Sequence, residues 1–121
     1  MYIIHERRKI LEKIIGKIFA IDFDGTICES NYPGVGVPKW PIINFIKQIQ
    51  KDNYIILYTM REGELLQNAI DYCSDFGIRL DAINDNIEFQ KQLYGNNPRK
   101  IYADYYLDDH NITLDEIMGE K

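Results

Sequence analysis

Residues 17–26 read KIFAIDFDGT, and this stretch decides the fold. Its first half is an unbroken apolar run, which is typical of strands buried on both faces of a parallel sheet. Its second half places Asp22 and Asp24 one residue apart directly after the run, followed by Gly25, which permits a sharp turn. The stretch predicts a buried strand that ends in an acidic turn.

Segments with strand and helix patterns alternate along the rest of the chain. After the strand at 17–22, further strands are expected at 54–58, 80–83 and 105–107. Helical periodicity predicts helices over 6–15, 41–51, 63–76, 85–94 and 111–118, with Gly16 and Gly77 as stop signals. This alternation predicts an α/β fold, a three-layer α/β/α Rossmann-like core with a parallel sheet.

Polar clusters follow three of the expected strands, at 22–24, 59–61 and 108–109. In open parallel sheets, reactive residues collect beyond the carboxyl ends of the strands. If one metal ion is to be reached from both Asp22 and Asp108, the first and fourth strands must be neighbours. The expected strand order is therefore 4-1-2-3, with a ligand crevice between strands one and four.

The totals fit one soluble domain of 121 residues, divided into an accessory N-terminal helix over 1–16 and a catalytic core over 17–121. The net charge of −5 argues against a general nucleic-acid binder, which needs a basic surface. The two cysteines form no Cys-x-x-Cys motif, the start is too charged for a signal peptide, and no apolar run approaches a membrane span. A cytoplasmic protein without a membrane partner is expected.

Two carboxylates as close as Asp22 and Asp24 repel each other unless a cation lies beside them. Hard oxygen ligands suit Mg²⁺, which takes one or two carboxylates together with substrate phosphate. With the metal bound, Asp22 could attack phosphorus as the nucleophile and form an aspartyl-phosphate. Asp24 could protonate the leaving oxygen and later accept a proton from water.

The pattern resembles the haloacid dehalogenase-like (HAD) hydrolase superfamily from about residue 17 to residue 112. The stretch DFDGT at 22–26 matches that superfamily's first motif, and the resemblance implies that Gly25 and Thr26 lie at the substrate. Thr59 matches the second motif. The pair Asp108 and Asp109 matches the fourth motif, so the resemblance implies metal ligation by Asp22, Asp24, Asp108 and Asp109, with Asp108 favoured as the direct ligand.

The third motif of the superfamily is a lysine that neutralises the phosphate. Lys100 is the chosen residue, because small deoxynucleotidase-like members resemble this chain in placing a lysine shortly before an Ala-Asp run. Lys100 can serve only if the chain turns near Ala103 and Asp104, since one straight strand over 101–107 would leave it at the wrong end of the sheet. Lys91 is the rival.

The gaps between the motifs leave no room for a cap domain. The turn-rich segment 30–40 is expected to form a short flap beside the site, with Tyr32 and Trp40 as wall residues. Arg61 has two readings, a bidentate grip on the substrate phosphate and a solvated surface side chain. The expected substrate is a small phosphorylated molecule, either a nucleotide or a sugar phosphate. The competing functions are a receiver-like phospho-acceptor module and a catalytically idle interaction protein.

Overall fold

The computed structural model describes residues 14–95 and 100–108. The expected helix at 111–118, most of the expected helix at 6–15, and Asp109 therefore lie outside the described residues. In chain order the elements are β1 (Ile18–Ile21), α2 (Trp40–Ile49), β2 (Tyr54–Leu57), α3 (Gly63–Asp75), β3 (Ala82–Ile83), α4 (Glu88–Tyr94) and β4 (Tyr105–Leu107). Within the described part, no helix is long and apolar enough to cross a membrane.

The four strands form one parallel sheet in the order β3-β2-β1-β4, which reads 4-1-2-3 from the β4 edge. β1 lies at the centre, with Ile21 paired to Leu57 of β2 on one side and to Leu107 of β4 on the other. Every residue of β1 is buried, as the unbroken apolar run predicts. The first and last strands are thus direct neighbours.

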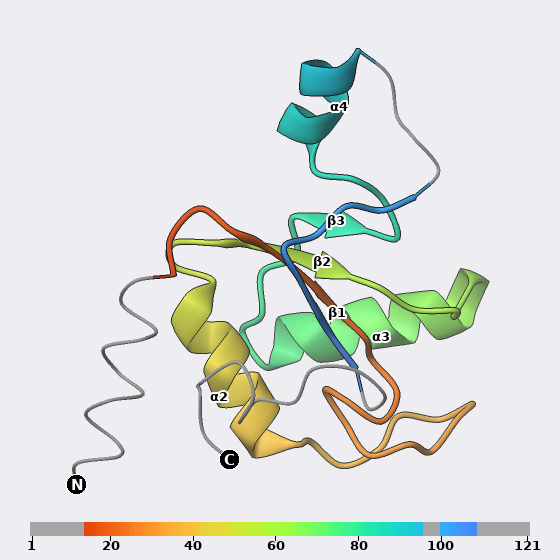
Figure 1. Ribbon diagram of the computed structural model, residues 1–121. Coiled ribbons are helices and arrows are strands. Elements are labelled where there is room, and N and C mark those ends of the chain that lie inside the picture. Colours follow the sequence, from red (N-terminus) through yellow and green to blue (C-terminus); the bar gives the residue numbers. More distant parts are fainter. Residues whose placement is uncertain (1–13, 96–99, 109–121) are drawn as a thin grey trace, which may run out of the picture.

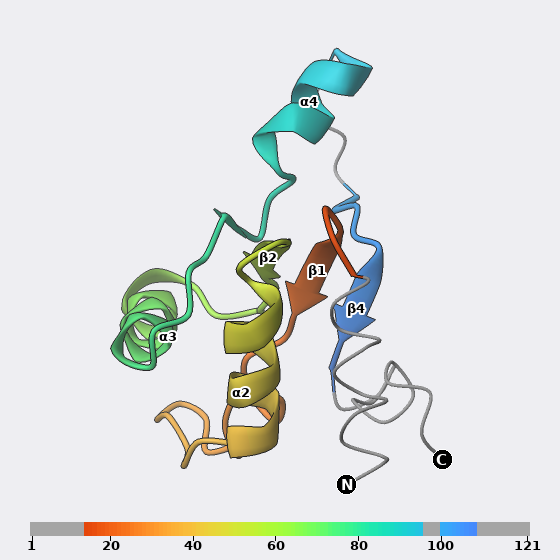
Figure 2. The same ribbon diagram turned by 90° about the vertical axis from the view of Figure 1, so that its left-hand side faces the viewer.

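Helices α2 and α3 pack on one face of the sheet (Figures 1 and 2). That face carries the larger core cluster, in which Phe19 contacts Phe45 of α2 edge-to-face and stacks on Tyr105 of β4. Burying an aromatic side chain of this size stabilises the fold by about 1.5–3 kcal/mol. α2 begins with Pro41 in its first turn, a position where the missing N–H costs nothing.

The opposite face is covered differently from the expected second helical layer. Its cluster joins Ile18, Ala20 and Ile56 of the sheet to Ile87 and Ala103. α4 begins directly after Ile87 but projects away from the sheet (Figures 1 and 2). Among the described residues, this face is therefore covered by connecting segments and not by a packed helix.

β3 and β4 both begin directly after an aspartate. The carboxylate of this aspartate, and not a main-chain carbonyl, accepts an N–H of the neighbouring strand. Asp81 donates its N–H to the carbonyl of Ile55, and its carboxylate accepts the N–H of Ile55 at 2.8 Å. Asp104 makes the same pair of bonds with Ile18, also with a 2.8 Å bond to the carboxylate. These side chains delay the start of the two strands, which explains why the strand expected at 80–83 is confined to Ala82–Ile83.

No cap domain interrupts the described chain. Between Asp24 and Thr59 the chain forms only the flap, α2 and β2. The flap is closed at its base where Glu29 donates its N–H to the carbonyl of Val37. A Cβ atom at Gly36 would overlap the carbonyl of Glu29, so this crossing requires glycine.

Candidate active site

The carboxyl ends of β1, β2 and β4 bring the expected acidic and hydroxyl residues to one edge of the sheet. Asp22 follows Ile21, and Asp108 follows Leu107, its partner in the ladder. The ladder continues one step further, because Asp22 donates its N–H to the carbonyl of Leu107 at 2.9 Å. Backbones of neighbouring strands lie about 4.8 Å apart, so Asp22 and Asp108 leave the sheet side by side.

This placement fits the donor set that Mg²⁺ uses. The ion takes one or two carboxylates, with water and substrate oxygens completing its shell. Asp22 and Asp108 are both half-buried, and one oxygen of Asp22 accepts the N–H of Phe23 at 2.8 Å. Residues 14–95 and 100–108 contain no group of three or more His, Cys, Asp or Glu side chains that could hold a metal. Among the described residues, a metal ion at this position would therefore have two carboxylate ligands and would not be fully enclosed by protein side chains.

Asp24 is held by Arg61 in a bidentate ion pair. The guanidinium Nε donates to Asp24 Oδ2 at 2.8 Å, and Nη2 donates to Oδ1 at 2.7 Å. This hydrogen-bonded pairing raises the pKa of Arg61 above its usual value. Paired fork geometry fixes the plane of a carboxylate as well as its position. Asp24 is therefore oriented by a side chain from the segment that follows the neighbouring strand β2.

The structure contradicts one of the two readings of Arg61 made from the sequence. Its side chain is among the most deeply buried in the protein, at 2% exposed, so it is not a solvated surface arginine. Its three remaining N–H groups donate to the carbonyls of Pro33, Gly34 and Leu65. All five donors are used within the chain, so in this structure Arg61 has no N–H left for a phosphate.

Gly25 and Thr26 form the turn that follows the first strand. Gly25 has φ +83°, the left-handed conformation expected of a glycine at this sharp turn. The N–H of Gly25 donates to Cys28, and that of Thr26 donates to Phe23. These two amides therefore close the turn, while the Thr26 hydroxyl is buried without a hydrogen-bond partner.

Thr59 is half-buried and is positioned by a residue that the sequence analysis did not single out. Its N–H donates to Asn84 Oδ1 at 2.8 Å, and its hydroxyl oxygen accepts the N–H of Arg61 at 3.2 Å. Asn84 follows β3 with φ 49°, a conformation that asparagine tolerates better than most residues. An asparagine directly after the third apolar strand was the available signal for this contact.

A pocket of about 430 Å³ opens over these residues. It is lined by Asp22, Asp24, Tyr32, Thr59, Met60 and Arg61. Tyr32 thus lines the site as expected, whereas Trp40 packs on Phe76, which directly follows α3, and is not among the described lining residues. Met60 is fully exposed at the mouth, so the pocket has an apolar rim beside its acidic floor.

The lysines occupy different surroundings. Lys91 forms ion pairs with Asp85 at 2.8 Å and Glu88 at 3.7 Å, and the hydrogen bond to Asp85 raises its pKa. Lys100 has an exposed side chain, and its carbonyl accepts a bond from Asn86. Neither lysine is among the described residues that line the pocket. Lys39, which the sequence analysis did not consider, reaches the acidic turn and donates to the carbonyl of Gly25 at 3.1 Å.

The turn that Lys100 requires is present. The chain runs back across the sheet before bending at Asp104 into β4 (Figure 1). The hydroxyl of Tyr106, on β4, donates to the carbonyl of Ile101 and accepts the N–H of Ala103. These bonds hold 101–103 beside β4, so 101–107 is not one straight strand and the objection to Lys100 is removed.

The fold has a precedent among solved structures. A conserved protein coded by a locus of Bacteroides thetaiotaomicron is 36% identical, with a TM-score of 0.69, over 80% of this chain and 78% of that one. The chain belongs to the family of this Bacteroides protein. The name of this relative states no activity. No family model and no curated protein matches the sequence.

Proposed function

We propose that this protein is a Mg²⁺-dependent phosphomonoester hydrolase of the HAD type, with Asp22 as the nucleophile. The observation that carries the proposal is the ladder between β1 and β4, which brings Asp22 and Asp108 side by side. Asp24 and Thr59 line the same pocket as Asp22. An acid pair, a third carboxylate and a hydroxyl around one pocket are the groups that phosphoryl transfer through an aspartate needs.

The proposed reaction has two displacements at phosphorus. In the first, an oxygen of Asp22 bonds to phosphorus, the ester P–O bond breaks, and the leaving oxygen takes a proton from Asp24. In the second, water attacks the phosphorus of the aspartyl-phosphate, Asp24 takes a proton from that water, and Asp22 is released. Because Asp24 accepts two hydrogen bonds from Arg61, it must first gain a proton from solvent or substrate before it can act as the acid.

Mg²⁺ would be held by the carboxylates of Asp22 and Asp108 and the backbone carbonyl of Asp24, with Asp109 in support. When bound, the ion screens the phosphate charge from the nucleophile. Thr59 would donate its hydroxyl hydrogen to a phosphoryl oxygen, because its oxygen accepts the Arg61 N–H through one lone pair and the O–H remains a donor.

The cysteines do not compete for the role of nucleophile. Both are buried free thiols, and burial raises the pKa of Cys28 and raises that of Cys73 to about 12. A thiol must lose its proton to become nucleophilic, so both are inert at neutral pH. Two free thiols also agree with the cytoplasm as the proposed compartment.

The proposed substrate is a small phosphorylated molecule such as a nucleotide or a sugar phosphate. No cap encloses the site in the described chain, and the pocket has room for a phosphate and part of a leaving group. A panel of phosphomonoesters assayed with and without Mg²⁺ tests the proposal. Turnover of at least one member is expected, and turnover of none would overturn it.

Activity is expected to require a divalent cation. Without one, the neighbouring carboxylates of Asp22 and Asp108 would repel an anionic substrate. Chelation should therefore remove turnover, and added Mg²⁺ should restore it while Ca²⁺, which prefers longer and more numerous oxygen contacts, restores far less. Full hydrolysis in excess chelator would contradict the proposed metal site.

The lysines are separated by substitution. Lys100→Ala is expected to lower kcat far more than Lys91→Ala, because Lys91 is already engaged by Asp85 and Glu88. Lys39→Ala serves as a third arm, since Lys39 contacts the carbonyl of Gly25. All three variants should remain folded by circular dichroism. A larger loss in Lys91→Ala or Lys39→Ala would move the neutralising role to that residue.

A further inference from the structure

Arg61 connects three parts of the chain that are distant in sequence. It pairs with Asp24 in the turn after β1, donates to Pro33 and Gly34 of the flap, and donates to Leu65 in the first turn of α3. Its guanidinium carbon lies 5.2 Å from the ring centre of Tyr32 on the flap. One buried cation thus holds both the floor and the wall of the same pocket.

We propose that Arg61 is a positioning residue that orients the Asp24 carboxylate and fixes the flap over the pocket. The catalytic part of this inference rests on the proposed function, because Asp24 has a catalytic role only if the protein hydrolyses phosphomonoesters. Each of the five donors has one partner, so the guanidinium that fixes the plane of the Asp24 carboxylate also holds two carbonyls of the flap.

Lysine cannot replace this arrangement. An ammonium keeps the positive charge but has three donors and no planar fork, so Arg61→Lys cannot hold both oxygens of Asp24 and both flap carbonyls. The substitution therefore tests the geometry of the contact while preserving its charge. Small errors in the orientation of a catalytic group are costly, on the order of 10²-fold for a displacement of about 1 Å.

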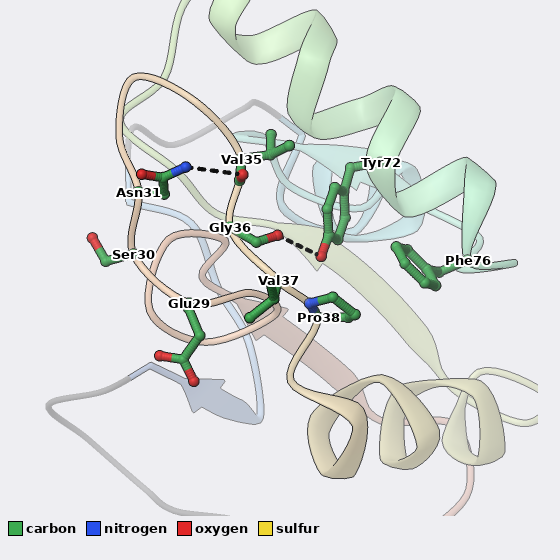
Figure 3. A pocket seen from close by; sticks show the side chains of 9 residues that line it. All are labelled: Glu29, Ser30, Asn31, Val35, Gly36, Val37, Pro38, Tyr72 and Phe76. Carbon is green, nitrogen blue, oxygen red and sulfur yellow. Dashed lines mark hydrogen bonds between the residues drawn. The ribbon is translucent and has the colours of Figure 1, made fainter.

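Two matched controls are available in the chain. The hydroxyl of Tyr72 on α3 donates to the carbonyl of Gly36 on the flap at 2.9 Å (Figure 3). Tyr72→Phe therefore loosens the flap without touching the Asp24 pair. Arg79 forms a bidentate pair with Asp81 at the other end of the strands, so Arg79→Lys removes the same chemistry from an unrelated position.

The activity arm compares an alkyl phosphate with an activated aryl phosphate. In Arg61→Lys, kcat should fall more on the alkyl phosphate than on the aryl phosphate, so that the aryl-to-alkyl ratio of kcat rises about tenfold. This rise is smaller than the full effect of losing general acid catalysis, because the Asp24 side chain is still present. Tyr72→Phe is expected to change KM for both substrates equally and to leave the ratio unchanged. Arg79→Lys should alter neither. An equal loss on both substrates in Arg61→Lys, or the same rise in the ratio in Tyr72→Phe, would overturn the proposal.

The second arm needs no turnover. Hydrogen–deuterium exchange of a peptide covering 26–39 should be about tenfold faster in Arg61→Lys and in Asp24→Asn at the amides of Glu29 and Lys39, which are hydrogen-bonded at the base of the flap, since either change breaks a link that holds the flap in place. Arg79→Lys is the control with unchanged exchange. If the wild type hydrolyses no phosphomonoester, the proposed function fails and this arm still decides the inference. Unchanged exchange in Asp24→Asn would contradict it even if Arg61→Lys does not fold.

Discussion

Replacing Asp22 by Asn is expected to abolish turnover of every phosphomonoester that the wild type hydrolyses. The change removes the attacking oxygen and a charged metal ligand together, because an amide is neither a nucleophile toward phosphorus nor an anionic ligand for Mg²⁺. Poor and good leaving groups should lose activity alike, because attack on phosphorus precedes any help to the leaving oxygen. The measurement is kcat on both substrate types at saturating Mg²⁺.

Asp75→Asn is the matched control for this substitution, since Asp75 is an exposed aspartate at the end of α3. It carries the same change in charge and should retain full activity. Asp22→Asn should remain folded, because the Oδ1 atom of Asn can still accept the N–H of Phe23. Residual turnover above a few per cent in Asp22→Asn would assign the nucleophile to another group.

Replacing Asp24 by Asn is expected to give a selective loss. General acid catalysis is typically worth about 10²–10⁴-fold, and it matters most when the leaving group is poor. Asp24→Asn should therefore lose most on alkyl phosphates and least on an activated aryl phosphate. Its backbone carbonyl, the proposed metal ligand, is unchanged by the substitution. The aspartyl-phosphate should also last longer, because the base that activates water is gone.

The ratio of aryl to alkyl turnover in wild type and Asp24→Asn measures this effect. Because Asp24 also anchors Arg61, loss of the pair is expected to loosen the flap, so Tyr72→Phe is assayed in parallel. If both substrates slow equally in Asp24→Asn, Asp24 supports the metal or the flap and is not the acid.

Much of the fold could be predicted from local pattern. The apolar runs at 17–22 and 54–58 are long enough to indicate strands, and β1 and β2 occupy most of each run. Requiring a shared metal at Asp22 and Asp108 made the first and fourth strands neighbours, and β1 pairs with β4. Gly77 ends α3 with φ +76°, as a stop signal should.

The covering of the second face of the sheet and the start of β3 could not be predicted from local sequence pattern. Helical periodicity at 85–94 predicts a helix but not what it packs against, and α4 projects from the sheet. The apolar residue Leu80 suggests a longer strand, whereas the Asp81 carboxylate takes the N–H of Ile55 and delays β3. Such side-chain bonds depend on the partner strand, which lies 26 residues away.

Arg61 shows why part of the site could not be predicted. Its partners Asp24 and Gly34 lie 37 and 27 residues away, and no periodicity relates these positions. A lone arginine two residues after Thr59 suggested phosphate binding, because its donors match phosphate oxygens. The fold supplies those donors with internal acceptors instead, and only the three-dimensional arrangement reveals this.

The receiver-like alternative predicts a different behaviour at Asp22. A receiver is phosphorylated once and releases its phosphate slowly, so it would show no repeated turnover of a phosphomonoester. The proposed hydrolase forms the same aspartyl-phosphate but passes it to water with the help of Asp24. Multiple turnovers per chain in the Mg²⁺ assay separate these two accounts.

The most direct test of the central claim is chemical trapping of the intermediate. Asp24→Asn is mixed with an aryl phosphate and Mg²⁺, quenched, and treated with borohydride, which reduces an acyl phosphate to the alcohol. Peptide mass spectrometry should then find homoserine at position 22, and Asp22→Asn on the same background should show none. Homoserine at another aspartate, or no reduced residue during active turnover, would contradict Asp22 as the nucleophile.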